Sequence, residues 1–346
     1  MEGLMSYSGL TTKIRAMQSH LLNVQNFREI VELEGVPQAV NYLKDKPSYG
    51  PLLGNLETED LHRGQIERLL KKSIYRDFAK LYRFSNASQR KFLDLYFGRY
   101  EVYFLKVCLT SILDHRQPSL DLRGFREFFD KHSKLKLENL EAASTVDEFL
   151  SAIKDSVYYP PLARLGETRQ PTLFDYEMTL DLNYFRRLWE NRTVIREKQG
   201  IKGLTKALGS KMDMLNIQWI YRCKKYYHMN SADIYALLIP VNYRLSSRTI
   251  QEMVEADSLE TLESLIEKCY YAKHYREFTE ERLETLYAEI LKYILSSESR
   301  KHPYSVTTIY SYLYHKEHEV DRLIIALECV RYRIAPEEAM KRVACR

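Results

Sequence analysis

The apolar positions along the chain follow a helical spacing. Between 58 and 83 they recur every three or four residues, at Leu61, Ile66, Leu69, Leu70, Ile74, Phe78, Leu81 and Tyr82. Thr58 is a suitable N-cap, and Glu59 and Asp60 follow it in the first turn, where the helix dipole favours acids. This pattern predicts a helix over 58–83.

The same spacing continues to the C-terminus. A second helix is predicted to start at Asn86 or Ser88 and to run through Phe92, Leu95, Tyr96, Leu105 and Leu109. Further long helices follow, separated by short Pro, Gly or Ser breaks, with no βαβ rhythm and no Asn-Gly or Asp-Gly hairpin turn. We therefore expect an all-α fold.

A short segment ending in tyrosine occurs three times. Leu43–Leu52 aligns with Ile153–Leu162 at an offset of 110 residues, and Ile266–Tyr271 is a third, shorter copy. The tyrosines that mark the three copies are Tyr49, Tyr159 and Tyr271. A predicted helix start precedes each copy, at Val36-Pro37, at Thr145–Glu148 and at Asp257–Glu260.

A second landmark follows each tyrosine. Glu101, Asp213 and Glu319 each stand four residues before an aliphatic residue, inside a long helix predicted to close the unit. The two landmarks predict three similar helical domains of ordinary size, with boundaries at 1–115, 116–228 and 229–346. The repeats can interleave, with the N- and C-terminal segments packing together.

The acids and tyrosines have two possible roles. Glu101, Asp213 and Glu319 could bind a partner or handle protons, or each could make a hydrogen bond or ion pair that holds its own helices together. We favour the second role, because catalysis needs acids that converge on one site. The tyrosines are likewise expected to be packing residues whose hydroxyls are satisfied.

No motif in the chain is specific for an enzyme or a cofactor. His315, His318 and Glu319 could face one side of a helix, but a metal site needs a fourth group and further side chains that orient the ligands. We interpret them as a solvated helix face. The glycines near 200–209 have the wrong spacing for a P-loop or a dinucleotide fingerprint. We predict a non-catalytic protein without a cofactor or metal.

Charge is distributed unevenly although the net charge is only +5. Residues 62–91 carry nine Lys or Arg against two acids, residues 184–211 eight against two, and residues 252–289 four against eleven. Such segments steer association between oppositely charged surfaces. Candidate docking charges are Arg68, Lys71, Lys72, Arg76, Arg186, Arg187 and Arg192. A pI near 8.7 and nearly balanced charges argue against nucleic acid.

Membrane insertion and disulfides are not expected. The longest apolar run, Ile234–Val241, is far shorter than the roughly 18 residues that span a bilayer. The N-terminal residues lack the basic start and apolar stretch of a signal peptide. The five cysteines are scattered and form no Cys-x-x-Cys pair, which favours reduced thiols in the cytoplasm.

Several stretches resemble one family over essentially the whole chain. Tyr7–Met17 resembles the opening of the C subunit of prokaryotic V-type (archaeal-type) ATPases, which is homologous to the d subunit of the eukaryotic enzymes. That family carries a Glu-x-x-Asn-Leu-like motif on each closing helix, and Asp213-Met-Leu-Asn216-Ile217 matches it chemically. The equivalent positions after Glu101 and Glu319 hold Phe104 and Arg322 instead of asparagine. Pro303–Arg331 also resembles the family's last helices.

The resemblance implies a mechanical part. The family is all-α, with three similar domains arranged as a funnel, and it performs no chemistry itself. It lies at the cytoplasmic face of the membrane, within the complex but peripheral to the bilayer. It connects the central shaft of the ATPase head to the membrane rotor ring and so couples ATP synthesis or hydrolysis to proton or sodium transport. The alternative that the sequence leaves open is a cytosolic helical-repeat scaffold for proteins or RNA.

Overall fold

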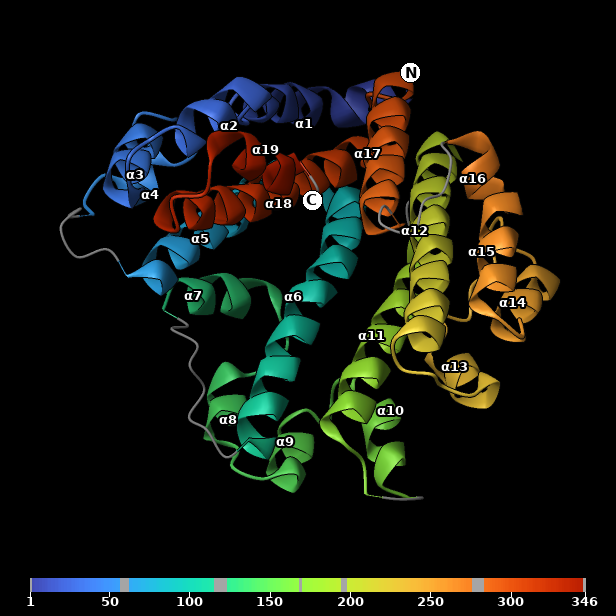
Figure 1. The fold of residues 1–346 in the computed structure, drawn as a ribbon. Coiled ribbons are helices and arrows are strands. Elements are labelled where there is room, and N and C mark those ends of the chain that lie inside the picture. Colours follow the sequence, from blue (N-terminus) through green and yellow to red (C-terminus); the bar gives the residue numbers. More distant parts are fainter. Residues whose placement is uncertain are drawn as a thin grey trace. The chain divides into compact units, whose positions relative to one another are not determined.

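The fold of the described chain is entirely helical. The computed structural model describes residues 2–56, 62–114, 123–167, 170–193, 198–275 and 283–344. These residues form nineteen α-helices and two short 3-10 helices, and they contain no strand (Figure 1). The predicted all-α fold class is confirmed.

The chain divides into two compact units, and the first joins the two ends of the chain. Unit 1 comprises Met1–Ala87 and Lys292–Arg346, and unit 2 comprises Ser88–Leu291. The helices of unit 1 are α1 (Glu2–Gln18), α2 (Val24–Val31), α3 (Val36–Lys44), α4 (Gly50–Leu53), α5 (Arg63–Phe84), the second half of α17 (Leu283–Lys301), α18 (Val306–Arg331) and α19 (Pro336–Ala344).

Unit 1 is built around α18. This helix packs against α1, α2, α3, α5 and α19, and in Figure 1 it lies between α5 and α19. Most of its side chains are buried, including apolar residues on every side of its first turns, as expected of a central helix. His315 is mostly buried, and Lys316 and Glu319 are buried. The interpretation of residues 315–319 as a solvated helix face is therefore wrong, because α18 is enclosed by helices from the other end of the chain.

Unit 2 contains two long helices and two sets of short ones. The long helices are α6 (Ala87–Leu113) and α12 (Lys198–Lys225). The remaining elements are α7 (Arg123–His132), α8 (Leu137–Ala142), α9 (Val146–Ala152), α10 (Tyr159–Ala163), η1 (Arg164–Glu167), α11 (Leu173–Glu190), η2 (Asn191–Thr193), α13 (Ser231–Leu237), α14 (Ser247–Val254), α15 (Leu259–Lys268), α16 (Tyr270–His274) and the first half of α17.

Local capping explains where several helices begin. The three predicted helix starts before the tyrosines are confirmed. Helix α3 begins at Val36 with a proline in its first turn, α9 follows the N-cap Thr145, and α15 follows the N-cap Ser258. The hydroxyls of Thr145 and Ser258 accept hydrogen bonds from amides of the first turn, which would otherwise have no partner.

The first two predicted helices are also present, with one changed boundary. Helix α5 begins at Arg63, after an extended His62, rather than at Thr58. Thr58, Glu59 and Asp60 lie outside the described residues. Helix α6 begins directly after Asn86, as predicted, and ends at Leu113.

Candidate functional site

Helix α18 holds one of three acid–tyrosine clusters, two of which have a buried acid while the third has the half-buried Glu101. The Tyr49 hydroxyl donates to Glu319 Oε1 at 2.5 Å, and the Lys316 ammonium donates to the same oxygen at 2.7 Å. The ammonium also donates to the Tyr49 hydroxyl oxygen at 2.9 Å, and the backbone amide of Leu22 donates to Glu319 Oε2. Tyr49 and Lys316 are fully buried, and Glu319 is 4% exposed. These bonds connect α18 to the α1–α2 loop and to the residue before α4.

Helix α12 carries the second cluster, around the fully buried Asp213. Its carboxylate accepts the Tyr271 hydroxyl at 2.7 Å and the backbone amides of Tyr243, Arg244 and Leu245 at 3.1, 2.7 and 3.2 Å. Burial raises the pKa of Asp213, and the four donated hydrogen bonds oppose this change. The cluster therefore joins α12 to the α13–α14 loop and to α16.

Helix α6 carries the third cluster. Glu101 accepts the Tyr158 hydroxyl at 2.6 Å and the Ser133 hydroxyl at 2.5 Å. Ser133 Oγ in turn accepts the amide of Leu135 at 3.0 Å, so the loop between α7 and α8 is held to α6. In all three clusters a long helix supplies the acid, a loop supplies further donors, and a tyrosine at the start of a short helix supplies the hydroxyl.

The tyrosine hydroxyls act as hydrogen-bond donors. Burial, followed by the nearby carboxylate, raises the pKa of Tyr49, Tyr158 and Tyr271 well above the ordinary value for tyrosine. Each hydroxyl therefore stays protonated and donates a hydrogen bond to the carboxylate. A hydrogen bond to a charged group contributes roughly 1.5–3 kcal/mol to stability. The clusters are suited to holding helices together.

In each sequence repeat a tyrosine precedes an acid, but in the structure the acid does not bind the tyrosine of its own repeat. Each acid binds the tyrosine of the following short-helix set, 57 residues onward for Glu101 and 58 for Asp213. Glu319 is the last acid, and it binds Tyr49 near the other end of the chain. In the second set the hydroxyl belongs to Tyr158, whereas Tyr159 is its neighbour at the start of α10. An ungapped alignment missed this, because the Leu43–Tyr49 segment is one residue longer than Ile153–Tyr158 and Ile266–Tyr271.

The position three residues after each acid is occupied by a different side chain in each cluster. Asn216 is fully buried and exchanges two hydrogen bonds with the backbone of Ile239, at 2.9 and 3.0 Å. Phe104 instead packs its ring near Phe125 and Phe129 of α7. Arg322 lies over the Phe27 ring and donates to the Val343 carbonyl oxygen at 3.1 Å. Asn216 and Phe104 thus contact the loop or helix that follows their own long helix. Arg322 contacts α2 near the N-terminus and α19 near the C-terminus.

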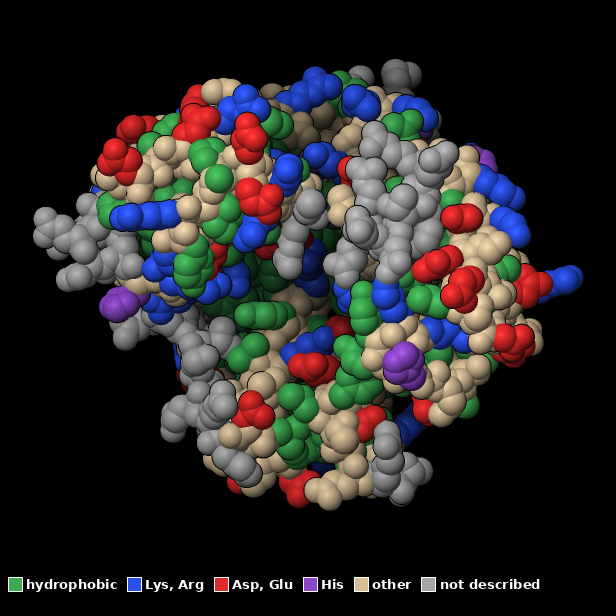
Figure 2. Space-filling view, in the orientation of Figure 1, with side chains coloured by type: hydrophobic (Ala, Val, Ile, Leu, Met, Phe, Trp, Pro, Cys, Tyr) green, Lys and Arg blue, Asp and Glu red, His purple; other side chains and the backbone are tan. Residues whose placement is uncertain are grey.

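The candidate docking charges fall into two groups. Arg68, Lys72 and Arg186 are exposed, whereas Lys71, Arg76, Arg187 and Arg192 are half-buried. Arg76 donates to the Ser48 carbonyl oxygen at 3.1 Å, the Arg187 guanidinium lies over the Tyr158 ring, and Arg192 lies over Trp189 and donates to its carbonyl oxygen. On the face that Figure 2 shows, Lys and Arg side chains are interspersed with Asp and Glu side chains.

A fourth buried acid–tyrosine pair was not predicted. The Tyr312 hydroxyl of α18 donates to Asp77 Oδ2 of α5 at 2.7 Å, and Lys80 donates to Asp77 Oδ1 at 3.0 Å. The sequence held a signal for it, because Asp77 falls on the apolar stripe of α5 between Ile74 and Leu81. A buried acid on such a stripe needs a partner.

The histidines considered as metal ligands have other partners. His315 Nδ1 lies 2.6 Å from the Ser311 carbonyl oxygen, and Nε2 lies 3.3 Å from Ser296 Oγ. The His318 ring packs on Tyr314. Within the described residues, no group of three His, Cys, Asp or Glu side chains is arranged to hold a metal ion.

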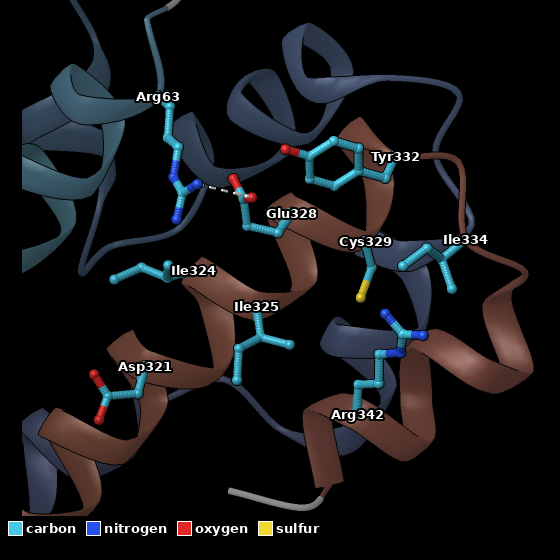
Figure 3. A pocket seen from close by; sticks show the side chains of 9 residues that line it. All are labelled: Arg63, Asp321, Ile324, Ile325, Glu328, Cys329, Tyr332, Ile334 and Arg342. Carbon is cyan, nitrogen blue, oxygen red and sulfur yellow. Dashed lines mark ion pairs between the residues drawn. The ribbon is translucent and has the colours of Figure 1, made fainter.

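Unit 1 also has a surface pocket on the outer face of α18. It has a volume of about 400 Å³ and is lined by Arg63, Asp321, Ile324, Ile325, Glu328, Cys329, Tyr332, Ile334 and Arg342. Arg63 pairs with Glu328 at 3.3 Å. Figure 3 places Tyr332 and Ile334 at one end of the pocket, near Cys329, and Asp321 at the other.

Comparison with known proteins gives one consistent family. The family model described as "ATP synthase (C/AC39) subunit" matches residues 10–342. The C subunit of the A-type ATP synthase of Pyrococcus abyssi is 26% identical, covering 97% of this chain and 90% of the relative. The proteins of the same name from Methanosphaera stadtmanae and Methanosarcina barkeri are 24% and 23% identical, over 97% and 93% of this chain and 86% and 88% of their own lengths.

Proposed function

The chain belongs to the ATP synthase (C/AC39) subunit family, and from this we propose that it is the non-catalytic rotor subunit that couples the central shaft to the membrane ring. The observation that carries the proposal is the family match over residues 10–342, nearly the whole chain. The resemblance noted from the sequence is thus confirmed at the level of the family. Its relatives are named as A-type ATP synthase subunits.

A mechanical role fits the way the acids are used. A coupler that transmits torque must resist deformation, and close-packed helices tied by buried hydrogen bonds are stiff. Glu101, Asp213 and Glu319 are each occupied by donors from their own cluster. A catalytic acid instead needs access to a substrate. This use of the acids supports a subunit without chemistry of its own.

The proposed arrangement is three similar helical domains forming a funnel, with the two chain ends contributing to one of them. The repeated order of long helix, loop and tyrosine supports it, because the same local architecture occurs around each acid. The proposed place of the subunit is the cytoplasmic face of the membrane. Among the described helices, none is both long and apolar enough to cross a bilayer. We propose that exposed Arg68, Lys72 and Arg186 contribute to electrostatic docking within the complex.

An affinity purification tests the function. The tagged chain is expressed in its own cells, membranes are washed and solubilised in mild detergent, and the proteins retained are identified by mass spectrometry. Recovery of shaft and ring subunits in constant ratio is the expected result. Recovery of soluble proteins or RNA without ATPase subunits would overturn the proposal in favour of a scaffold. An unrelated protein with the same tag, expressed at the same level, is the control.

A further inference from the structure

A continuous series of aromatic rings and guanidinium groups runs across one part of unit 2. The Arg192 guanidinium lies 3.9 Å from the centre of the Trp189 ring, which in turn lies 6.5 Å from the centre of the Tyr243 ring. The Arg244 guanidinium lies 5.0 Å from the ring centres of both Tyr243 and Tyr270. We call these five residues the Arg244 surface. All five belong to unit 2, and the printed contacts connect each one to the next.

The Arg244 surface is held in place by the elements that build it. A Cβ on Gly209 would lie 2.4 Å from Cγ of Tyr243, so this ring lies directly against α12. The backbone amides of Tyr243 and Arg244 both donate to Asp213. Side chains that are ordered before a partner arrives lose less entropy on binding. The contributing elements are the end of α11 with Trp189, η2 with Arg192, the α13–α14 loop with Tyr243 and Arg244, and α16 with Tyr270.

The positive charges of the Arg244 surface are not compensated by acids. Neither of its arginines forms an ion pair within the described part of the chain. Arg244 is exposed and lies beside rings, whereas Arg248, four residues later, pairs with Glu252 at 2.8 Å. Residues 234–251 and 268–275, which supply Tyr243, Arg244 and Tyr270, contain no acid. The surface therefore presents positive charge that an external anion can compensate.

The residue types of this surface favour a carboxylate-bearing protein as that anion. A guanidinium stacked on a ring keeps its N–H edge available for two parallel hydrogen bonds to a planar carboxylate. Trp, Tyr and Arg are the residues that contribute most to binding energy in protein interfaces, and the buried centres of such interfaces are depleted in Lys, Glu and Asp. The Arg244 surface consists of only these three favoured types.

The neighbouring helices limit the size of the anion. Residues 252–267, in α14 and α15, contain six acids and no basic residue. Helix α15 packs against α14 and against α16, which carries Tyr270 (Figure 1). This acidic side repels an extended polyanion, such as nucleic acid or an anionic bilayer. A short acidic segment of a protein can contact the Arg244 surface without covering α14 and α15.

We propose that the Arg244 surface is the docking site for a short acidic segment of another protein subunit. Carboxylates of that segment bind Arg244 and Arg192, and its apolar atoms pack on the rings between them. The inference rests on the proposed function, because that function places the chain among the subunits of a complex. It adds the chemistry by which one of those subunits is recognised.

Photo-crosslinking in the assembled complex identifies what contacts this surface. Asn242 is exposed and directly precedes Tyr243, so p-benzoylphenylalanine is incorporated in place of Asn242 in the cells that produce the complex. Their membranes are irradiated, and crosslinked peptides are identified by mass spectrometry. The expected product joins position 242 to a peptide of another subunit with Asp or Glu beside the crosslinked residue. The same amino acid in place of Tyr103, an exposed residue of α6, is the control and should not capture this peptide.

Two arginines of one segment provide a matched pair of variants. Arg244→Gln in the crosslinking chain should lower the yield of this product about tenfold, as expected of an interface hot spot. Arg248→Gln removes the same charge from a side chain that already pairs with Glu252, so the yield should not change. Arg244→Lys keeps the charge but loses the planar fork, and it should also lower the yield. The Arg244 variants retain the backbone amide that binds Asp213, so their melting temperatures should match that of the wild type.

The inference and the proposed function can fail separately. If the wild type purified from membranes lacks ATPase subunits, the proposed function fails, whatever position 242 captures. The inference is overturned if position 242 captures lipid, nucleic acid, a second copy of this chain or a peptide without acids, or captures nothing. Equal crosslinking yields for Arg244→Gln and Arg248→Gln would also overturn it and would leave the proposed function intact.

Discussion

The hydroxyl of Tyr49 lies 2.5 Å from the carboxylate of Glu319, although 270 residues separate them in the chain. The Lys316 ammonium donates to the Tyr49 hydroxyl oxygen and to Glu319 Oε1, so each of the three side chains in unit 1 is hydrogen-bonded to the other two. The triad connects α18 to the residue before α4, and Leu22 adds the α1–α2 loop. Substituting single members of this triad therefore tests how strongly the two ends of the chain are held together.

Tyr49→Phe removes one hydroxyl and leaves the ring in place. The free energy of unfolding is expected to fall by about 1.5–3 kcal/mol, because a hydrogen bond to a buried charged group is lost. Urea unfolding followed by circular dichroism measures the change. Tyr103→Phe, at an exposed position of α6, is expected to change stability by less than about 0.5 kcal/mol. Equal stability of the two variants would show that the Tyr49 hydroxyl contributes nothing.

Lys316 and Glu319 are expected to be strongly coupled. Lys316→Met leaves the Glu319 carboxylate buried without its cation, which should cost about 3–5 kcal/mol. Lys316→Met/Glu319→Gln removes both charges and should be more stable than the sum of the two single effects implies. A double-mutant cycle by urea unfolding gives the coupling energy. Additive single effects would contradict the buried ion pair.

Gly209 is expected to tolerate no side chain. A Cβ at this position of α12 would lie 2.4 Å from Cγ of Tyr243, the residue whose amide, with those of Arg244 and Leu245, binds Asp213. Gly209→Ala should therefore displace this loop and lower the free energy of unfolding by about 1–3 kcal/mol.

The matched control is Gly9→Ala in α1, where a Cβ meets no atom within 4 Å. Because alanine is the better helix former, this change should raise stability by up to about 1 kcal/mol. Thermal unfolding distinguishes the two signs. A stabilising Gly209→Ala would mean that Tyr243 does not close over α12.

His315 should make stability depend on pH. Burial, with a smaller contribution from Lys292, lowers the pKa of His315 from its ordinary value of 6.5. The unfolded chain then binds the proton more readily than the folded chain, so the stabilising contribution is complete above pH 6.5 and is lost as the pH falls below it. The slope from one such group is at most about 1.4 kcal/mol per pH unit.

His315→Gln should remove this part of the slope. Urea unfolding between about pH 5 and 8, the range in which histidine titrates, compares the variant with the wild type. His132, whose pKa burial also lowers, contributes its own slope to both proteins and so does not affect the difference. His62→Gln, at an exposed position before α5, is the control. Parallel curves for the wild type and His315→Gln would contradict the prediction.

The sequence pattern predicted local features well, because these depend on neighbouring residues. The helical class, the starts of α3, α6, α9 and α15, and the acids of the three long helices all follow from spacing and capping chemistry. The contact between an acid and its tyrosine depends instead on how loops close over 57 residues or more, which no local pattern contains. The choice between Tyr158 and Tyr159 likewise depends on which ring is buried, since both follow the same short helix.

Unit 1 combines an N-terminal and a C-terminal segment, and this affects how the protein folds during synthesis. Its first 87 residues leave the ribosome long before α18 exists, yet the Tyr49 hydroxyl and the Leu22 amide donate hydrogen bonds to Glu319 of that helix. In the sequence, unit 2 falls wholly between the two segments of unit 1, so its own acid–tyrosine contacts can form while synthesis continues. The N-terminal helices must remain incompletely packed until α18 has been synthesised, and they form their final contacts only then. A premature stop anywhere before α18 thus leaves the beginning of the protein, as well as its end, without a native partner.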